Sequence, residues 1–308
     1  MRRNPVDAID DSITGPHGPV PIRRYAPTAP PGGAAPSALS PTIVWLHGGG
    51  FFAGNLDMAE SDAVARSFAA AGFRVVTVDY RLVPPVGSRW PIRRGAPTVR
   101  YPVPLDDVFA VVEQIQSESP DGVVLGGASA GACLAAATVA RLAQSAGLPG
   151  LPGLPGLPAQ PGHASQPLRG VFFIYGLFHA VFPAPPADLV RPTGRRRYTH
   201  APAMLNLMSR NYAGSSDALS DPFAFPGGHP LPPFPRTLMI DADHDSIRAS
   251  SAAFANELEA AGVDLDYRLI PGTQHAFLNR PNDPAFTEAV SGIVEWAGEI
   301  ATPRLHAE

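Results

Sequence analysis

Short apolar runs rich in β-branched residues recur along the chain, and longer segments with a helical period lie between them. The apolar runs predict strands at residues 42–46, 74–79, 123–125, 171–175, 237–241 and 265–270. The intervening segments predict helices at residues 59–71, 105–117, 130–143, 250–261 and 284–300. Strands that alternate with helices favour an α/β fold, with a mostly parallel central sheet and helices on both faces. Residues 20–25 add an antiparallel strand near the N-terminus.

Three segments interrupt this alternation. Residues 84–100 are rich in Pro and Arg, and residues 147–162 carry Leu-Pro-Gly three times, followed by Leu-Pro-Ala. In residues 147–162 the density of proline bars a helix or a central strand. We therefore expect an exposed loop there, as an inert insertion rather than a peptide-binding segment. Residues 178–235 contain one predicted helix, at 201–212, among loops. A long irregular excursion is typically functional, and we expect a small lid with a short N-terminal contribution.

Length and composition narrow the classes of function. The 308 residues, 45% of them hydrophobic, suit a single domain over residues 1–308. A net charge of −4 provides no field to hold nucleic acid or an anionic membrane. All 23 basic residues are arginine, which excludes a Schiff-base lysine, a P-loop lysine and a pyridoxal-phosphate anchor. Cys133 is the only cysteine, so the chain has no intramolecular disulfide and no Cys-rich metal site.

The N-terminus does not resemble a signal peptide, because Arg2 and Arg3 are followed by Pro5 and Asp7 rather than by an apolar segment. Residues 122–140 carry no charge, yet Gly, Ala and Ser make up most of this stretch, which suits a buried strand and helix better than a membrane span. We therefore expect a cytoplasmic protein without stable membrane insertion. A homodimer is left open.

A serine stands at the apex of a predicted strand–turn–helix. Gly127 and Gly131 flank Ser129 at two residues on either side, between the apolar run and an Ala-rich helix. Glycines at these positions allow a strained turn and close packing, which leave the serine oxygen exposed. Chance occurrence of the pentapeptide in a Gly/Ala-rich chain is the alternative, but the strand–turn–helix context favours a nucleophile.

The first central strand leads directly into His47, three consecutive glycines and Phe51. Such glycines let backbone N–H groups point at a substrate oxygen, as an oxyanion hole for acyl transfer requires. A phosphate-binding loop would need a lysine or a GxGxxG pattern, and neither follows. We expect oxyanion donors at Gly48 and Gly49, with the N–H of Ala130 as the third. His47 is expected to orient the loop rather than act as the base.

The serine needs a base and an acid that orients that base. His275 follows the strand predicted at 265–270, at a carboxyl end of the sheet, where catalytic groups of open α/β sheets gather. The acid should follow the preceding strand, where Asp241, Asp243 and Asp245 crowd together. These residues alone leave the choice among the three open.

The motifs together resemble the hormone-sensitive-lipase-like family of α/β-hydrolases. The resemblance rests on HGGGF at 47–51, GxSxG at 127–131, Asp-x-Ile-Arg at 245–248 and a late His-x-Phe at 275–277, in this order. It extends from about residue 15 to residue 296, apart from the inserts. It implies an α/β-hydrolase fold and, by alignment of 245–248 with the family's Asp-Pro-Leu-Arg, Asp245 as the acid. Asp243 is the runner-up.

Other candidate residues have a functional and a structural interpretation. The segment 241–245 could ligate a metal, but no second ligand cluster accompanies it, and we expect neither a metal nor a cofactor. Arg195, Arg196 and Arg197 could attract an acidic substrate, although a solvated charge run is the default. Candidate substrate-pocket residues, which helix packing alone would also explain, are Phe51, Tyr198, Met204, Leu205, Met208 and Tyr212.

These features predict a serine carboxylic-ester hydrolase that acts on short- to medium-chain acyl esters through an acyl-enzyme. Its partner would be a small-molecule ester. Two alternatives stay open at this point. One is amide deacetylation or acyl transfer on the same fold, and the other is a non-catalytic binding protein on a hydrolase scaffold.

Overall fold

The computed structural model describes residues 6–28, 40–87, 99–147, 168–189, 193–194 and 196–301. Their strands form one eight-stranded sheet in the order β1-β2-β4-β3-β5-β6-β7-β8. Pairings β1–β2 and β2–β4 are antiparallel, and all the others are parallel. The strands are β1 (Ala8–Gly15), β2 (Gly18–Tyr25), β3 (Thr42–Leu46), β4 (Val75–Val78), β5 (Val123–Ala128), β6 (Gly170–Ile174), β7 (Thr237–His244) and β8 (Leu265–Gln274). The predicted, mostly parallel α/β sheet is confirmed.

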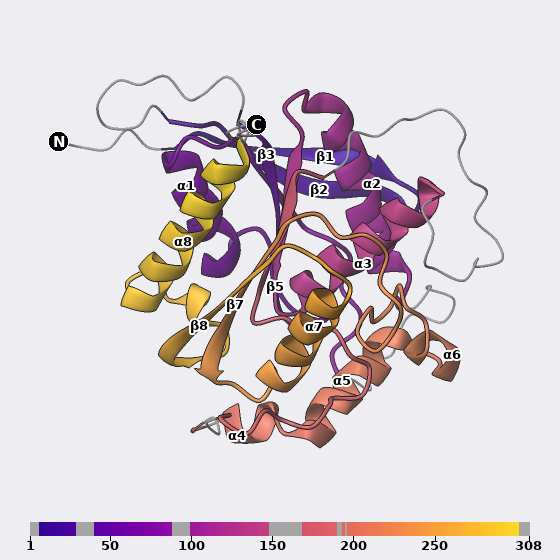
Figure 1. Ribbon diagram of the computed structural model, residues 1–308. Coiled ribbons are helices and arrows are strands. Elements are labelled where there is room, and N and C mark those ends of the chain that lie inside the picture. The colour runs from indigo at the N-terminus through magenta and orange to yellow at the C-terminus, as the bar shows by residue number, and fades with distance from the viewer. Residues whose placement is uncertain are drawn as a thin grey trace.

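Helices cover both faces of this sheet (Figure 1). They are α1 (Ala59–Ala70), α2 (Val103–Glu118), α3 (Ala130–Ser145), α4 (Arg196–Thr199), α5 (Pro202–Ala213), α6 (Ser216–Leu219), α7 (Arg248–Ala260) and α8 (Pro284–Ala301), with a 3-10 turn at Phe277–Asn279. Helices α1 and α8 pack on one face, and α2, α3 and α7 pack on the other. The buried side chains accordingly form two hydrophobic clusters, one on each side of the sheet.

The central strand β3 shows why the apolar runs become strands. All five of its residues are buried, and successive side chains point to opposite faces. Val44 and Leu46 belong to the cluster under α2 and α3, whereas Ile43 and Trp45 belong to the cluster under α1 and α8. The ring of Trp45 stacks on Phe172 with centroids 5.5 Å apart. A continuous apolar run is therefore what a strand covered on both faces requires.

Strand β1 was not predicted. It is an edge strand, and most of its residues are exposed, so it lacks a hydrophobic pattern. It pairs with β2 as a hairpin in which Gly15 lies opposite Gly18. Arg23 and Arg24 of β2 form ion pairs with Asp10 and Asp11 of β1. Cross-strand charge pairs stabilise this edge in place of buried apolar side chains.

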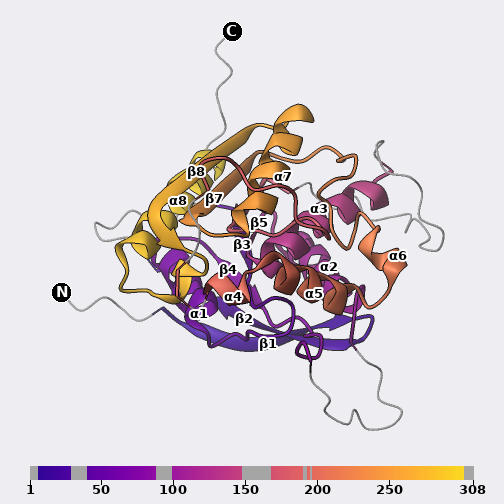
Figure 2. The same cartoon turned by 90° about the horizontal axis from the view of Figure 1, so that it is seen from below.

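The excursion over residues 178–235 contains more helix than the sequence predicts. Helix α5 matches the predicted helix at 201–212, but the one-turn helices α4 and α6 accompany it, which corrects the expectation of a single helix. Segments of four residues are too short to show a helical period, so a sequence pattern cannot reveal them. Seen from below, α4 and α5 lie across the carboxyl ends of the parallel strands (Figure 2).

Most of the two Pro-rich segments lies outside the described residues, namely 88–98 of the first and 148–162 of the second. The expectation of an exposed loop at 147–162 thus stays a prediction. None of the helices that the structure describes is long and apolar enough to cross a membrane.

Candidate active site

Ser129 lies on a sharp turn between β5 and α3. Its φ of 52° and ψ of −116° are unusual for a residue with a side chain, and such backbone strain is a feature of functional sites. The flanking glycines make the turn possible. A Cβ on Gly127 would lie 2.3 Å from the carbonyl carbon of Gly131, and a Cβ on Gly131 would lie 2.4 Å from the carbonyl oxygen of Leu46. The GxSxG pattern therefore reflects close backbone approach on both sides of the serine.

The structure brings Ser129, His275 and Asp245 together in one chain of hydrogen bonds. Nε2 of His275 lies 2.9 Å from Oγ of Ser129, and Nδ1 of His275 lies 2.6 Å from Oδ2 of Asp245. The three residues follow β5, β8 and β7, whose parallel pairing places their carboxyl ends at one edge of the sheet. All three side chains are buried, with residue exposures of 5%, 6% and 1% for Ser129, His275 and Asp245.

Only one of the three candidate carboxylates reaches the histidine. The second oxygen of Asp245 accepts a hydrogen bond from the N–H of Ile247 at 3.0 Å, which orients the group. Asp243 instead accepts from the N–H of Gly272 at 3.0 Å. Asp241 accepts from the hydroxyl of Tyr267 at 2.8 Å, and burial raises its pKa to about 7.

The glycine loop after β3 differs from the sequence prediction at one donor. The N–H of Gly48 donates to Oε1 of Glu60 at 2.6 Å, so Gly48 is not free to bind an oxyanion, and its assignment as a donor was wrong. No hydrogen bond among the described residues uses the N–H of Gly49 or Gly50. The N–H of Ala130 is the first of helix α3 and has no intrahelical acceptor. The unpaired donors beside Ser129 are therefore Gly49, Gly50 and Ala130.

The loop takes a conformation that needs glycine. Gly49 has a φ of 120°, and a Cβ on it would lie 1.9 Å from the carbonyl oxygen of Ala53. A Cβ built on Gly48 would lie 3.0 Å from Cβ of Ser129, so the loop lies directly against the serine. His47 is fully buried, and its Nδ1 lies 2.7 Å from the carbonyl oxygen of Gly48. Burial lowers the pKa of His47 to about 4, so the ring is neutral and its Nδ1–H supports the loop.

Glu60, in the first turn of α1, is the site residue that sequence reasoning missed. Besides the N–H of Gly48, its carboxylate accepts from the hydroxyl of Tyr175 at 2.5 Å and from the amide of Asn279 at 3.1 Å. The group is fully buried, and burial raises its pKa. The ring of Tyr175 packs edge-on against His275 with centroids 4.8 Å apart. An acidic residue in a first helical turn is common, so nothing in the sequence singled Glu60 out.

The six predicted pocket residues differ widely in exposure. Phe51 and Tyr212 are fully buried and stack with ring centroids 3.9 Å apart, and Leu205 is buried as well. Tyr198 and Met204 are instead 62% and 43% exposed. Helix packing accounts for the buried members of the set, and a substrate pocket formed by these residues stays a prediction. A Cβ on Gly50 would lie 2.7 Å from Sδ of Met208, so Met208 is the member of the set that reaches the glycine loop.

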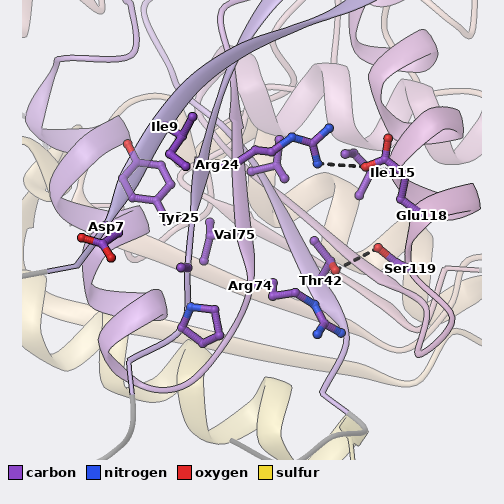
Figure 3. Close-up of a pocket in the computed structure, with 13 residues that line it drawn as sticks. Asp7, Ile9, Arg24, Tyr25, Thr42, Arg74, Val75, Ile115, Glu118 and Ser119 are labelled. Atoms are coloured by element: carbon purple, nitrogen blue, oxygen red, sulfur yellow. Dashed lines mark hydrogen bonds and ion pairs between the residues drawn. The ribbon is translucent and has the colours of Figure 1, made fainter.

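A separate cavity of about 290 Å³ is lined by residues of β1, β2, β3, β4 and α2 (Figure 3). Thr42 and Val75 in its wall begin β3 and β4, so the cavity lies at the amino ends of strands whose carboxyl ends carry the site. Arg24 pairs there with Glu118, and the hydroxyl of Ser119 donates to Thr42. This cavity is distinct from the candidate active site. Within the part of the chain that the structure describes, no group of His, Cys, Asp and Glu is suited to hold a metal ion.

The geometry defines a serine hydrolase of the α/β class, and comparison with known proteins places the chain within it. Residues 43–279 match the alpha/beta hydrolase fold family Abhydrolase_3, so the chain belongs to this family. The ethyl acetate hydrolase of Pseudomonas putida is 28% identical to it, over 94% of this chain and 80% of that relative.

Solved structures agree with this assignment. The hyperthermophilic esterase from the archaeon Pyrobaculum calidifontis superposes with a TM-score of 0.74 at 25% identity, over 96% of this chain and 86% of that chain. Brefeldin A esterase, a bacterial homologue of human hormone sensitive lipase, superposes with a TM-score of 0.70 at 23% identity, over 97% and 78%. The resemblance inferred from the motifs is confirmed.

Proposed function

We propose that the protein is a serine carboxylic-ester hydrolase. The observation that carries this proposal is the chain of hydrogen bonds from Asp245 through His275 to Ser129, beside unpaired backbone N–H groups. Similarity to an ethyl acetate hydrolase and to an archaeal esterase supports the same chemistry.

In the proposed reaction, His275 Nε2 removes the proton of Ser129 Oγ as that oxygen attacks the ester carbonyl carbon. Asp245 holds the ring in the tautomer with hydrogen on Nδ1 and stabilises the imidazolium that forms. The N–H groups of Gly49, Gly50 and Ala130 stabilise the oxyanion of the tetrahedral intermediate. His275 then gives its proton to the leaving alcohol, and an acyl group stays on Ser129. Water activated by His275 releases the acid and restores the serine.

The test is turnover of p-nitrophenyl acetate by the wild-type protein and by Ser129→Ala. We expect hydrolysis by the wild type and loss of nearly all turnover in the variant, with an unchanged circular dichroism spectrum. Asp245→Asn should lower kcat by about 10⁴-fold because it favours the wrong tautomer. Asp243→Asn is the matched control, since that carboxylate bonds to Gly272 rather than to His275. Near-wild-type turnover in Ser129→Ala would refute the proposal.

The substrates we propose are short- to medium-chain acyl esters. A cytoplasmic location stays a prediction, and a homodimer stays open.

A further inference from the structure

One residue of the excursion over 178–235 touches the proposed catalytic base directly. His200 follows α4, and its ring lies edge-on to the ring of His275 with centroids 4.8 Å apart. Nδ1 of His200 is buried and has no hydrogen-bond partner among the described residues. Burial lowers the pKa of His200 to about 4, so the ring is neutral near pH 7. A neutral imidazole next to the reacting groups can therefore offer a hydrogen bond that no described residue uses.

Arg196 lies one helical turn before His200. The N–H of His200 donates to the carbonyl oxygen of Arg196 at 2.9 Å, and side chains four residues apart lie on the same side of such a turn. Arg196 is half-buried, and burial lowers its pKa even though the nearby Asp245, Tyr175 and Glu60 act in the opposite direction. Asp245, Tyr175 and Glu60 therefore act on the charge of this guanidinium.

Arg196 makes no side-chain hydrogen bond or ion pair with any described residue, in contrast to comparable arginines of this protein. Arg141 pairs with Asp106 at 2.5 Å and Arg248 pairs with Asp188 at 2.6 Å. Partial burial of a cation without a partner is unfavourable in free energy. An anion that accepts a bidentate hydrogen bond from the guanidinium offsets this cost. No described residue supplies such an anion, which leaves the substrate as its source.

We propose that Arg196 and His200 form a subsite for a carboxylate carried by the substrate, on the alcohol side of its ester bond. The inference rests on the proposed ester hydrolysis and specifies its substrate class. The alcohol side follows from the mechanism, because the leaving oxygen takes its proton from His275 and must lie beside that ring. His200 packs on His275, so a group that extends from the leaving oxygen along this ring meets His200, with Arg196 one helical turn away.

A second role for Arg196 makes a different prediction. If the guanidinium served only to balance the charge of Asp245, its loss would disturb the Asp245–His275 pair and slow every ester by the same factor. A substrate subsite instead affects the anionic ester selectively. For each variant, the kcat/KM of an anionic ester is divided by that of an uncharged ester. This ratio separates the two roles, because the intrinsic reactivities of the two esters are the same for every variant and drop out when the ratios are compared.

The experiment measures kcat/KM for 4-acetoxybenzoate and for its uncharged counterpart 4-acetoxybenzamide. The proteins compared are the wild type, Arg196→Gln, Arg196→Lys and Arg210→Gln. Arg210 is exposed on α5, so its variant removes the same charge from the same excursion and is the matched control. We expect Arg196→Gln to lower the ratio of the anionic to the neutral ester tenfold or more, and Arg196→Lys to lower it less. Arg210→Gln should keep the wild-type ratio.

The other outcomes are distinguishable. An equal fall for both esters in Arg196→Gln would overturn the subsite in favour of charge balance. An unchanged ratio in Arg196→Gln, or an equal change in Arg210→Gln, would overturn it as well. Turnover of 4-acetoxybenzamide by the wild type tests the proposed function separately. If the wild type hydrolyses neither ester, the proposed ester hydrolysis fails, and the subsite falls with it.

Discussion

Glu60 connects the glycine loop of the site with the ring that packs on the histidine base. One carboxylate oxygen accepts a hydrogen bond from the N–H of Gly48. The other accepts one from the hydroxyl of Tyr175, whose ring packs on His275. Fixing Gly48 orients the loop whose next two N–H groups are unpaired. Fixing Tyr175 restricts the ring of the base. Glu60 is thus a positioning residue that acts through these neighbours and does not touch the substrate.

Replacing Glu60 tests this role. Glu60→Leu leaves the buried N–H of Gly48 without an acceptor, which costs about 1–3 kcal/mol and frees the loop. We expect kcat for p-nitrophenyl acetate to fall at least tenfold with a smaller change in KM, since oxyanion stabilisation acts in the transition state. Glu60→Gln keeps an oxygen acceptor, so its kcat should fall less. An unchanged kcat in a folded Glu60→Leu protein would contradict the role.

Asp241 makes the stability of the protein depend on pH. Burial is the main cause that raises its pKa from 3.8 to about 7, against the hydrogen bond from Tyr267. Between these two values the folded state holds a proton that the unfolded chain has lost. The free energy of unfolding therefore falls as pH rises from about 4 to about 7, by up to about 4 kcal/mol from this group.

Asp241→Asn should remove that contribution, because the amide keeps an oxygen for Tyr267 and cannot ionise. We expect the stability of this variant relative to wild type to increase between pH 5 and pH 8, as measured by urea unfolding at both pH values. Asp217→Asn, an exposed position in α6, is the control and should show no such change. A stability difference that is the same at both pH values would disprove the raised pKa.

At the scale of elements, the turn from β5 into α3 depends on backbone contact with β3. A Cβ on Gly131 would lie 2.4 Å from the carbonyl oxygen of Leu46 and 2.5 Å from that of His47. No side-chain rotation can relieve such a contact, so α3 must shift away from β3. The serine and the glycine loop would then move apart, because they stand on these two elements.

Gly131→Ala should therefore lower the free energy of unfolding by about 1–3 kcal/mol and reduce turnover. Gly298→Ala, in helix α8, is a matched control, since a Cβ there meets no atom within 4 Å. Alanine has the better helix propensity, so we expect this control to gain about 0.5–1 kcal/mol. Thermal unfolding and ester turnover of both variants test these expected changes in stability and activity. Equal stability of the two would show that α3 adjusts freely.

At the scale of the whole molecule, the apolar side chains of the helices over the carboxyl ends either pack into the core or are exposed to solvent. The buried side chains Leu205 and Tyr212 of α5 pack into the core, and Tyr198 and Met204 face solvent. Each buried methylene contributes about 0.8 kcal/mol, but a chain in water gains nothing to offset the entropy lost on binding.

We therefore expect kcat/KM to be greatest for acyl chains of about two to six carbons. A series of p-nitrophenyl esters at fixed detergent concentration measures this preference. A maximum at twelve carbons or more, or activation at an oil–water interface, would instead indicate an enclosed acyl tunnel.

The α/β class, the core strands and the candidate serine and histidine could all be predicted from the sequence. These features depend on residues that are close in sequence. Apolar runs predict β3 to β8, and glycines two residues from Ser129 predict the turn. The family resemblance selected Asp245 among three neighbouring carboxylates. The exposed strand β1 and the one-turn helices α4 and α6 carry no periodic signal, so the sequence did not predict them.

The pairing of polar groups, by contrast, follows from the fold. Glu60 meets Tyr175 across 115 residues and Asn279 across 219, and by accepting from Gly48 it removes that N–H from the oxyanion donors. The contact of His200 with His275 and the absence of a side-chain partner for Arg196 among the described residues are likewise visible only in the folded chain. The physical reason is that hydrogen bonds and charges are satisfied by neighbours in space, whereas backbone periodicity and turn geometry are set by neighbours in sequence.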